Sequence, residues 1–317
     1  MAGVKKRFTS SGYLVRGAKV LLVNHRRFQL WLPIGGHIEP DEDPVETLCR
    51  EAREETGFQI EIVAERPGIQ RFGTNVQPAP VAMLMYDIRP GPVLIDLVYF
   101  VRPVGGTQRL AASEHRAMRW FDREALRHPS IPDNVRLLGT QAIDLIAHSP
   151  PPPSVQSAHE CGSQRVAGVD KHFTSTGFLV RDGKVLLVNH RKLRMWLPFG
   201  GHIEPNEDPV EALHREAREE TGFEIEIVAE RPEIDQRGVH VLPAPETILL
   251  EDIEPGHIHI DLIYFVRPVG GAQRLASNEH SEMRWFDREA LNDEVITADV
   301  RLLGTQAIDR IEGRNGA

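Results

Sequence analysis

The sequence predicts two tandem domains of the α/β class, each an α/β/α sandwich built around a mixed sheet. The first observation behind this prediction is an internal repeat at a constant offset, 165 residues, which aligns Gly36 with Gly201 and Trp120 with Trp285. The second is the order of elements in each copy: strand-like runs lie on both sides of an acidic helical segment, and another helical segment closes the copy. So long a period exceeds any solenoid unit and indicates duplication of a whole domain.

A stretch rich in proline and small polar residues joins the two copies, SPPPPSVQSAHECGSQ at residues 149–164. This composition favours an extended, partly stiff linker without regular structure. We therefore expect domains at residues 1–148 and 165–317. A chain of 317 residues is long enough for each domain to bury a core of its own.

Composition and charge narrow the class of partner. The chain is 41% hydrophobic and 26% charged, and it has no apolar run near the length that spans a bilayer. No secretion signal opens it, so a cytoplasmic location without membrane partners is expected. A net charge of −9 argues against binding long nucleic acid, whereas a small phosphorylated ligand stays compatible because a bound metal reverses the local field. The two cysteines, Cys49 and Cys161, fall at unmatched positions of the repeat, which argues against a disulfide framework.

Each copy begins with two short strands separated by a turn. In the first copy these are SGYLVR at 11–16 and KVLLVNH at 19–25. After the acidic segment, alternating apolar residues predict a strand at 59–66, and a β-branched and aromatic run predicts another at 94–102. Helical spacing returns at 135–148 and predicts the closing helix.

The acidic segment carries strong helix signals at both ends. Asp43 suits the N-cap, Pro44 the first helical position, and Glu46 completes a capping box. Gly57 suits the left-handed residue just beyond the last turn. These signals predict a helix from about Pro44 to Thr56, whose narrow apolar stripe packs on a sheet.

Three carboxylates project from the other side of this helix. Glu51, Glu54 and Glu55 stand at i, i+3 and i+4, so they share one face and repel each other unless something positive lies among them. A solvated helix whose glutamates pair with Arg50 and Arg53 is one interpretation. The preceding glycine pair and the nearly identical second copy favour a site for Mg²⁺ or Mn²⁺, which prefer clustered carboxylate oxygens.

The surrounding residues resemble the Nudix hydrolase family, whose pattern is G-x5-E-x7-R-E-U-x-E-E-x-G-U with U a bulky aliphatic residue. Over residues 36–58 only three of 23 positions differ between the copies. Two departures recur in both copies: alanine at the first aliphatic position and phenylalanine at the second, both of which are apolar. The residues that align with the pattern, the phenylalanines included, are Gly36, Glu42, Arg50, Glu51, Glu54, Glu55, Gly57 and Phe58, and Gly201, Glu207, Arg215, Glu216, Glu219, Glu220, Gly222 and Phe223.

The resemblance implies hydrolysis of a nucleoside diphosphate linked to another group, by attack of water on phosphorus with a divalent metal. Glu54 and Glu219 are the most plausible bases for that water. Glu42 with Arg50, and Glu207 with Arg215, look like supporting pairs. The predicted metal-binding residues are Gly36, Glu51, Glu54, Glu55, Gly201, Glu216, Glu219 and Glu220.

Further candidates lie outside the motif. Glu114 and Glu279 each stand six residues before a tryptophan and resemble the late carboxylate that some Nudix enzymes use as a metal ligand or base; an exposed loop glutamate is the alternative. His115 and His280 beside them are additional candidates.

Substrate contacts are expected from three pairs of residues, each with a simpler alternative. The histidine after the glycine pair could instead bond within its loop, the arginine could lie at a solvated strand end, and the tyrosine could pack in the core. The predicted substrate-binding residues are Arg26, His37, Tyr99, Arg191, His202 and Tyr264.

The second copy alone carries His257 and His259, whose spacing on one strand face can bind metal. The first copy has Pro92 and Leu94 there, so a chemistry common to both copies cannot depend on these histidines. A difference in substrate between the two copies could depend on them.

Alternatives to a pyrophosphohydrolase stay open at this point. One is a nucleotide sensor without catalysis, although intact carboxylates in both copies argue against it. Another is an enzyme acting on isoprenoid diphosphates, against which the unmatched cysteines count. The expected partner is a small nucleotide-type substrate, and the two domains could pair as an intramolecular pseudo-dimer.

Overall fold

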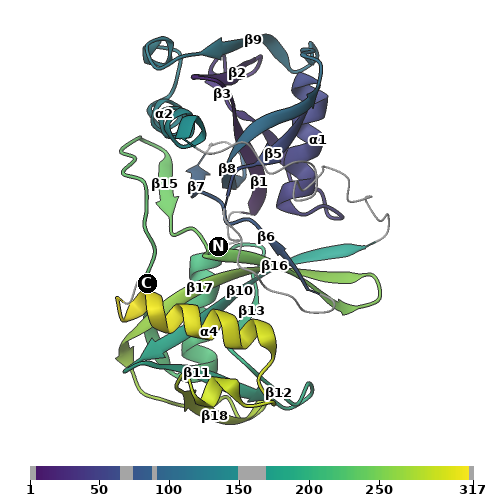
Figure 1. The fold of residues 1–317 in the computed structure, drawn as a ribbon. Helices are drawn as coiled ribbons and strands as arrows, with labels where there is room; N and C mark the ends of the chain where they lie inside the picture. The colour runs from purple at the N-terminus through teal and green to yellow at the C-terminus, as the bar shows by residue number, and fades with distance from the viewer. Residues whose placement is uncertain (1–4, 65–73, 88–90, 149–168, 314–317) are drawn as a thin grey trace. The chain divides into compact units, whose positions relative to one another are not determined.

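The computed structural model describes residues 5–64, 74–87, 91–148 and 169–313, which form two compact units (Figure 1). The predicted linker at 149–164 lies outside the described residues. Unit 1 contains most of the first copy of the repeat, and unit 2 most of the second. Each unit holds a mixed sheet with helices packed on it, which confirms the predicted α/β class.

Unit 1 is built on a sheet in which β1 and β8 run parallel and every other described strand pair is antiparallel. Its elements are β1 (Lys6–Arg16), β2 (Lys19–His25), β3 (Trp31–Leu32), β4 (Ile34–His37), α1 (Pro44–Thr56), β5 (Phe58–Ile62), β7 (Ala82–Asp87), β8 (Val93–Gly106), β9 (His115–Phe121), the 3₁₀ turn η1 (Ala125–Arg127), α2 (Asp133–His148) and β15 (Val239–Leu242).

Unit 2 repeats this arrangement, with β10 and β17 as the parallel pair. Its elements are β6 (Thr74–Gln77), β10 (Asp170–Arg181), β11 (Lys184–His190), β12 (Met195–Leu197), β13 (Phe199–His202), α3 (Pro209–Glu216), the π-helical turn η2 (Ala217–Thr221), β14 (Phe223–Ile227), β16 (Thr247–Glu254), β17 (His257–Gly271), β18 (His280–Phe286), the 3₁₀ turn η3 (Ala290–Asn292) and α4 (Ala298–Ile311).

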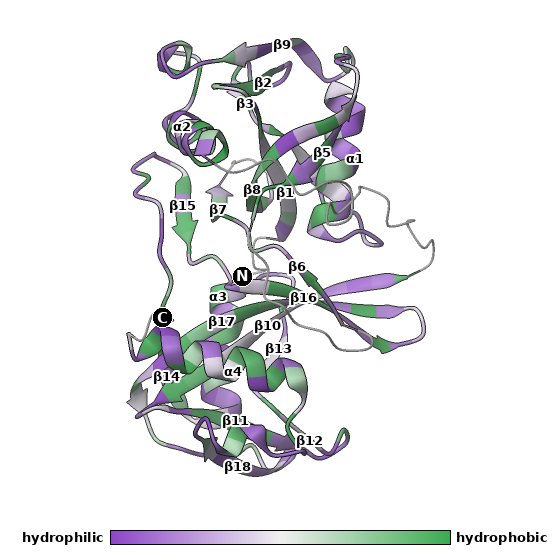
Figure 2. Ribbon diagram, in the orientation of Figure 1, coloured by the Kyte–Doolittle hydropathy of each residue, from purple (hydrophilic) through white to green (hydrophobic). Residues whose placement is uncertain are grey.

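The alternation of side chains along β1 separates the two helical layers of unit 1. Tyr13 and Val15 belong to the core cluster that α2 covers. Gly12 faces the other way, where Leu48 of α1 lies so close that a Cβ on the glycine would contact it. Helices therefore lie on both faces of the sheet, as the sandwich prediction requires. Figure 2 shows hydrophobic residues along the strands and mixed colouring on α1 and α4, as expected for helices with one buried side.

Each unit completes its sheet with a strand from the other copy of the repeat. In unit 1, β15 lies antiparallel to β7 and pairs Val241 with Leu84. In unit 2, β6 lies antiparallel to β16 and pairs Val76 with Leu249. Because Val239 on β15 is only 9% exposed within the unit 1 core, the exchanged strand supplies core as well as hydrogen bonds.

Helix α1 has the predicted bounds and caps. The Asp43 carboxylate accepts hydrogen bonds from the backbone N–H groups of Val45 and Glu46, and the Glu46 carboxylate accepts one from the backbone N–H of Asp43. Gly57 ends the helix with a left-handed φ of 76°. In unit 2 the α-helix ends at Glu216, and a π-helical turn continues the same path to Thr221.

Two further expectations concern cysteine and the membrane. Cys49 is disulfide-bonded, contrary to the expectation drawn from the unmatched cysteines. Among the helices that the structure describes, none combines the length and apolar character that crossing a membrane demands.

Candidate functional site

A single guanidinium lies among the carboxylates of α1. Arg50 Nη1 donates to Glu51 Oε1 at 2.8 Å and to Glu54 Oε2 at 3.2 Å. Its Nε donates to Glu42 Oε1 at 2.7 Å, and its Nη2 donates to the backbone oxygen of His37 at 3.3 Å. This cation offsets the repulsion that the sequence creates on one helix face, and it ties the helix to the loop before it.

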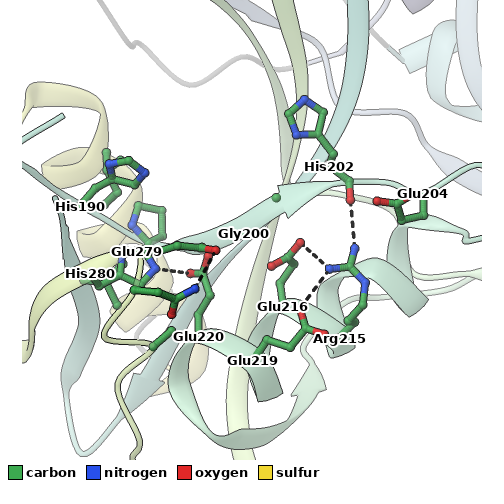
Figure 3. A pocket seen from close by; sticks show the side chains of 16 residues that line it. His190, Gly200, His202, Glu204, Arg215, Glu216, Glu219, Glu220, Glu279 and His280 are labelled. Carbon is green, nitrogen blue, oxygen red and sulfur yellow. Dashed lines mark hydrogen bonds and ion pairs between the residues drawn. The ribbon is translucent and has the colours of Figure 1, made fainter. Parts of the chain in front are cut away.

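Unit 2 repeats the arrangement, and Figure 3 shows Arg215 between Glu216, Glu219 and the backbone oxygen of His202. Arg215 Nη1 lies 2.6 Å from Glu216 Oε1 and 3.4 Å from Glu219 Oε2, and Arg215 Nε lies 2.8 Å from Glu207 Oε1. Its Nη2 donates to the backbone oxygen of His202 at 3.0 Å. The same constellation therefore forms on an α-helix in one unit and across the junction with a π-helical turn in the other.

The glycine of the motif makes room for the first carboxylate. Gly36 lies on β4 directly against Glu51, and a Cβ at this position would overlap Glu51 Oε1. Gly201 stands in the same relation to Glu216. The requirement for glycine here is thus steric, because any larger residue would displace a carboxylate from the site.

The third carboxylate of the helix is buried and bonded on both oxygens. Glu55 is 4% exposed; its Oε2 accepts from the backbone N–H of Gly35 at 3.1 Å, and its Oε1 lies 2.5 Å from His115 Nε2. Potential ligand atoms of Glu55, Glu114 and His115 all lie within 4.8 Å of one another. The predicted late carboxylate, Glu114, therefore does reach the motif helix.

In unit 2 the equivalent group is Glu220, Glu279 and His280. His280 Nε2 lies 3.2 Å from Glu220 Oε2, which is longer than the corresponding distance in unit 1. Both histidines are almost completely buried, at 1% for His115 and 3% for His280. From the sequence, these histidines are weaker candidates than the neighbouring glutamates. The signal that could have identified them is the Glu-His pair that stands at the same place in both copies.

Burial and the neighbouring arginines shift the pKa values of these carboxyl groups in opposite directions. Burial raises the pKa of Glu51 and of Glu216, and the adjacent arginine only partly compensates. For Glu42, burial also raises the pKa, but hydrogen bonds from Arg50 and Thr47 outweigh it and the net shift is downward. The supporting glutamate is therefore held ionised, whereas the glutamate beside the glycine gives up its proton less readily.

A pocket of about 650 Å³ opens over these groups in unit 2. Figure 3 shows Glu216, Glu219 and Arg215 on one side of it and His190, Glu279 and His280 on the other. Glu219 is exposed to 61%, so its carboxylate is accessible to solvent. The same fraction applies to Glu54 in unit 1.

Four of the predicted substrate-binding residues lie at the surface. Arg26 Nε donates to the backbone oxygen of Ala112 at 2.9 Å, and Arg191 Nε donates to that of Ser277 at the same distance. The bond positions each guanidinium beside the segment that carries the late glutamate. The side chains of His37 and His202 are exposed.

The predicted substrate contacts of Tyr99 and Tyr264 are wrong. Both are 0% exposed and belong to the interior of their units. A ring without an exposed face cannot stack on a base. The β-branched and aromatic run that contains them is a central strand of the sheet, so the core interpretation holds.

The donor atoms at each site fit a hard divalent cation. One carboxylate of the motif helix, that of Glu55 or Glu220, lies close to a carboxylate from the loop before β9 or β18. Mg²⁺ and Mn²⁺ take such oxygens together with water and phosphate. The residues that would hold the metal in unit 2 are Glu216, Glu219, Glu220 and Glu279, with Glu51, Glu54, Glu55 and Glu114 in unit 1.

Comparison with known sequences identifies the protein family to which this motif belongs. The model of the NUDIX domain family matches residues 6–138 and again residues 171–303, which is more than half of the chain. Nucleoside triphosphatase NudI of Enterobacter sp. (strain 638) is 31% identical over 113 residues, an alignment that covers 35% of this chain and 74% of that protein.

Two mammalian relatives are matched over smaller parts. The 8-oxo-dGDP phosphatase NUDT18 of Homo sapiens is 29% identical over 129 residues, covering 39% of this chain and 34% of the relative. The asymmetrical bis(5′-nucleosyl)-tetraphosphatase of Mus musculus is 29% identical over 97 residues, covering 30% and 56%. The chain thus aligns with about a third of one relative and about half of the other.

Among solved structures, a NUDIX family hydrolase from Clostridium perfringens matches with 28% identity and a TM-score of 0.40, covering 44% of this chain and 97% of that one. The MutT NUDIX hydrolase from Burkholderia pseudomallei matches with 22% identity and a TM-score of 0.32, covering 44% and 97%.

Proposed function

The chain belongs to the Nudix hydrolase family, and on that premise we propose that it is a divalent-metal-dependent pyrophosphohydrolase with a catalytic site in each unit. The proposed reaction cleaves a nucleoside diphosphate linked to another group, by attack of water on phosphorus. The observation that carries the proposal is the duplicated carboxylate face, which consists of Glu51, Glu54 and Glu55 in unit 1 and of Glu216, Glu219 and Glu220 in unit 2. In both copies one arginine bonds the first two of these glutamates, with matching bonds.

Different residues of the chain have different roles in the proposed reaction. A bound Mg²⁺ or Mn²⁺ supplies charge to offset the phosphates and lowers the pKa of a coordinated water. Glu54 and Glu219 are exposed enough to accept a proton from that water. Arg50 and Arg215 hold the glutamates on one face, and the glycine pair keeps the approach to Glu51 and Glu216 free of side chains.

The names of the relatives support a nucleotide substrate. They describe action on 8-oxo-dGDP, on a bis(5′-nucleosyl)-tetraphosphate and on nucleoside triphosphates. What these compounds share is a nucleoside joined to a phosphoanhydride, so this is the substrate class we assign. A cytoplasmic location and an intramolecular pseudo-dimer of the two domains stay predictions.

The test is product release from a panel of nucleoside triphosphates, nucleotide sugars, ADP-ribose and dinucleoside polyphosphates, with and without Mg²⁺ or Mn²⁺. The double variant Glu54→Gln/Glu219→Gln should lose activity while keeping the fold. Each single variant should keep the activity of the other unit, and this assigns a substrate to each site.

The matched control replaces two other exposed glutamates, Glu124→Gln and Glu289→Gln, at the starts of the 3₁₀ turns. It makes the same change of charge away from the carboxylate face. Activity in the control without activity in the catalytic double variant supports the proposal. Near wild-type turnover in the catalytic double variant contradicts it, and nucleotide binding without any metal-dependent cleavage would point to a sensor instead.

A further inference from the structure

Four histidines gather in unit 2 on the three strands β10, β13 and β17. The strand register brings them together, because His172 pairs with His259, and Thr174, on the same face of β10 as His172, pairs with His202. His257 and His259 stand two residues apart on β17 and so point to the same face of the sheet.

The rings lie close to one another. The ring centroid of His172 is 4.7 Å from that of His257 and 5.7 Å from that of His202. The ring of His259 is 4.7 Å from His202 and 5.0 Å from His257. One ring nitrogen from each of His172, His202 and His257 lies within 4.8 Å of the other two, so modest rotamer changes bring three donors to one ion.

The fold does not require this cluster. At the equivalent positions unit 1 carries Arg7, Pro92 and Leu94, and it retains only His37. Unit 1 nevertheless forms the same parallel strand pair in the same register. The side chains are also not core residues, since His202 is exposed and the other three are partly exposed.

We propose that His172, His202 and His257, with His259 beside them, form a binding site for a transition-metal ion of the Zn²⁺ class. Neutral imidazole suits Zn²⁺, Ni²⁺ and Cu²⁺, whereas carboxylates and water suit Mg²⁺ and Mn²⁺. The site therefore differs in chemistry from the carboxylate face of the same unit. Asp170 adds an oxygen 3.0 Å from His172 Nε2, which can complete the ligands or orient the ring.

The site adjoins the catalytic pocket without merging with it. Figure 3 shows the His202 ring directed away from Glu216 and Glu219, although the backbone oxygen of His202 accepts from Arg215. The same residue lines the pocket of about 650 Å³. An ion held by these imidazoles places positive charge at the rim of this pocket, in unit 2 alone.

The test is competition for Zn²⁺ between the full-length, metal-free chain and a chromophoric chelator, in an excess of Mg²⁺ that saturates the carboxylates. One Zn²⁺ equivalent should bind, and Co²⁺ in its place should give the visible absorption bands of nitrogen coordination. His172→Arg, which installs the residue of unit 1, and His257→Gln should each weaken this binding at least about tenfold.

Controls separate the site from the rest of the chain. His148→Gln changes an exposed histidine of α2, and Glu219→Gln changes the carboxylate face; both should leave the Zn²⁺ equivalent intact. Far-ultraviolet circular dichroism verifies that the histidine variants are folded. The proposal is overturned if the wild-type chain takes up no Zn²⁺ in excess Mg²⁺, or if folded His172→Arg or His257→Gln binds it as tightly as the wild type.

Discussion

His115 Nε2 lies 2.5 Å from Glu55 Oε1, and both side chains are nearly inaccessible to solvent. The bond joins β9 to the motif helix across 60 residues of sequence. Since the other oxygen of Glu55 accepts from Gly35, the carboxylate is fixed against both the glycine pair and the segment that carries Glu114. Glu55 thus links three parts of the candidate site.

Replacement of His115 by glutamine should loosen this link. We expect about a tenfold weaker apparent affinity for Mg²⁺ or Mn²⁺, because partners that orient a ligand commonly contribute that much. The measurement is the metal-concentration dependence of hydrolysis in a Glu219→Gln background, so that only unit 1 contributes. His280→Gln in a Glu54→Gln background should have a smaller effect, since its Nε2 lies 3.2 Å from Glu220. An unchanged metal dependence in folded His115→Gln would show that the bond does not position the site.

Gly36→Ala should inactivate unit 1 with little change in stability. The added Cβ would overlap Glu51 Oε1 and displace that carboxylate, and displacement of a reacting group by about 1 Å can cost about 100-fold in rate. The measurements are kcat/KM in the Glu219→Gln background and urea unfolding. Gly139→Ala is the matched control, because its nearest neighbours lie 3.4–3.5 Å away and alanine favours α2. If Gly36→Ala retained full activity, the steric role of the glycine would be excluded.

The titration of Asp96 makes the free energy of unfolding decrease as the pH rises. Burial raises the pKa of this carboxyl from 3.8 to about 6, against the lowering effect of the hydroxyls of Ser11 and Thr9. The folded state therefore binds the proton of Asp96 more tightly than the unfolded state does. The stability that this proton contributes is fully present below about pH 4 and is lost as the pH rises through 6.

Asp96→Asn removes this titration while its amide oxygen can still accept from both hydroxyls. The variant should gain up to about 3 kcal/mol relative to the wild type between about pH 4 and about pH 8, from a shift of about two pKa units. Urea unfolding followed at several pH values measures the difference. A difference that stays constant across this range would contradict an elevated pKa. Asp261→Asn is the equivalent change in unit 2, where burial likewise raises the pKa to about 6.

Features set by local sequence could be predicted. The caps of α1 depend on Asp43, Glu46 and Gly57, which act on backbone groups a few residues away, and all three are found in those roles. The repeat offset likewise predicts that every site residue of unit 1 has a counterpart in unit 2. The carboxylate face follows from helical spacing alone.

Features that depend on distant partners could not be predicted. Tyr99 lies in a run that any exposed or buried strand could contain, and only its place in the centre of the sheet shows that it has no free face. His115 is separated from Glu55 by 60 residues, so no local pattern connects them. The exchange of β6 and β15 is hidden for another reason: the two strands occupy equivalent places in the repeat, and a strand pattern does not specify which edge it joins.

The strand exchange predicts that a substitution in one copy of the repeat destabilises the unit built from the other. Val239 is 9% exposed in the core of unit 1, and Val76 is 8% exposed in the core of unit 2. Val239→Ala should lower the free energy of unfolding of unit 1 by about 1–2 kcal/mol, because two buried methyl groups are lost. Val76→Ala should do the same to unit 2.

Tryptophan fluorescence can follow each unit separately. Trp31 and Trp120 report on unit 1 when Trp196 and Trp285 are replaced by phenylalanine, and the reverse pair reports on unit 2. In urea unfolding, Val239→Ala should shift the transition seen by the unit 1 tryptophans. If it shifted only the unit 2 transition, each copy would have to complete its own sheet, and the exchanged pairing of β15 with β7 would be wrong.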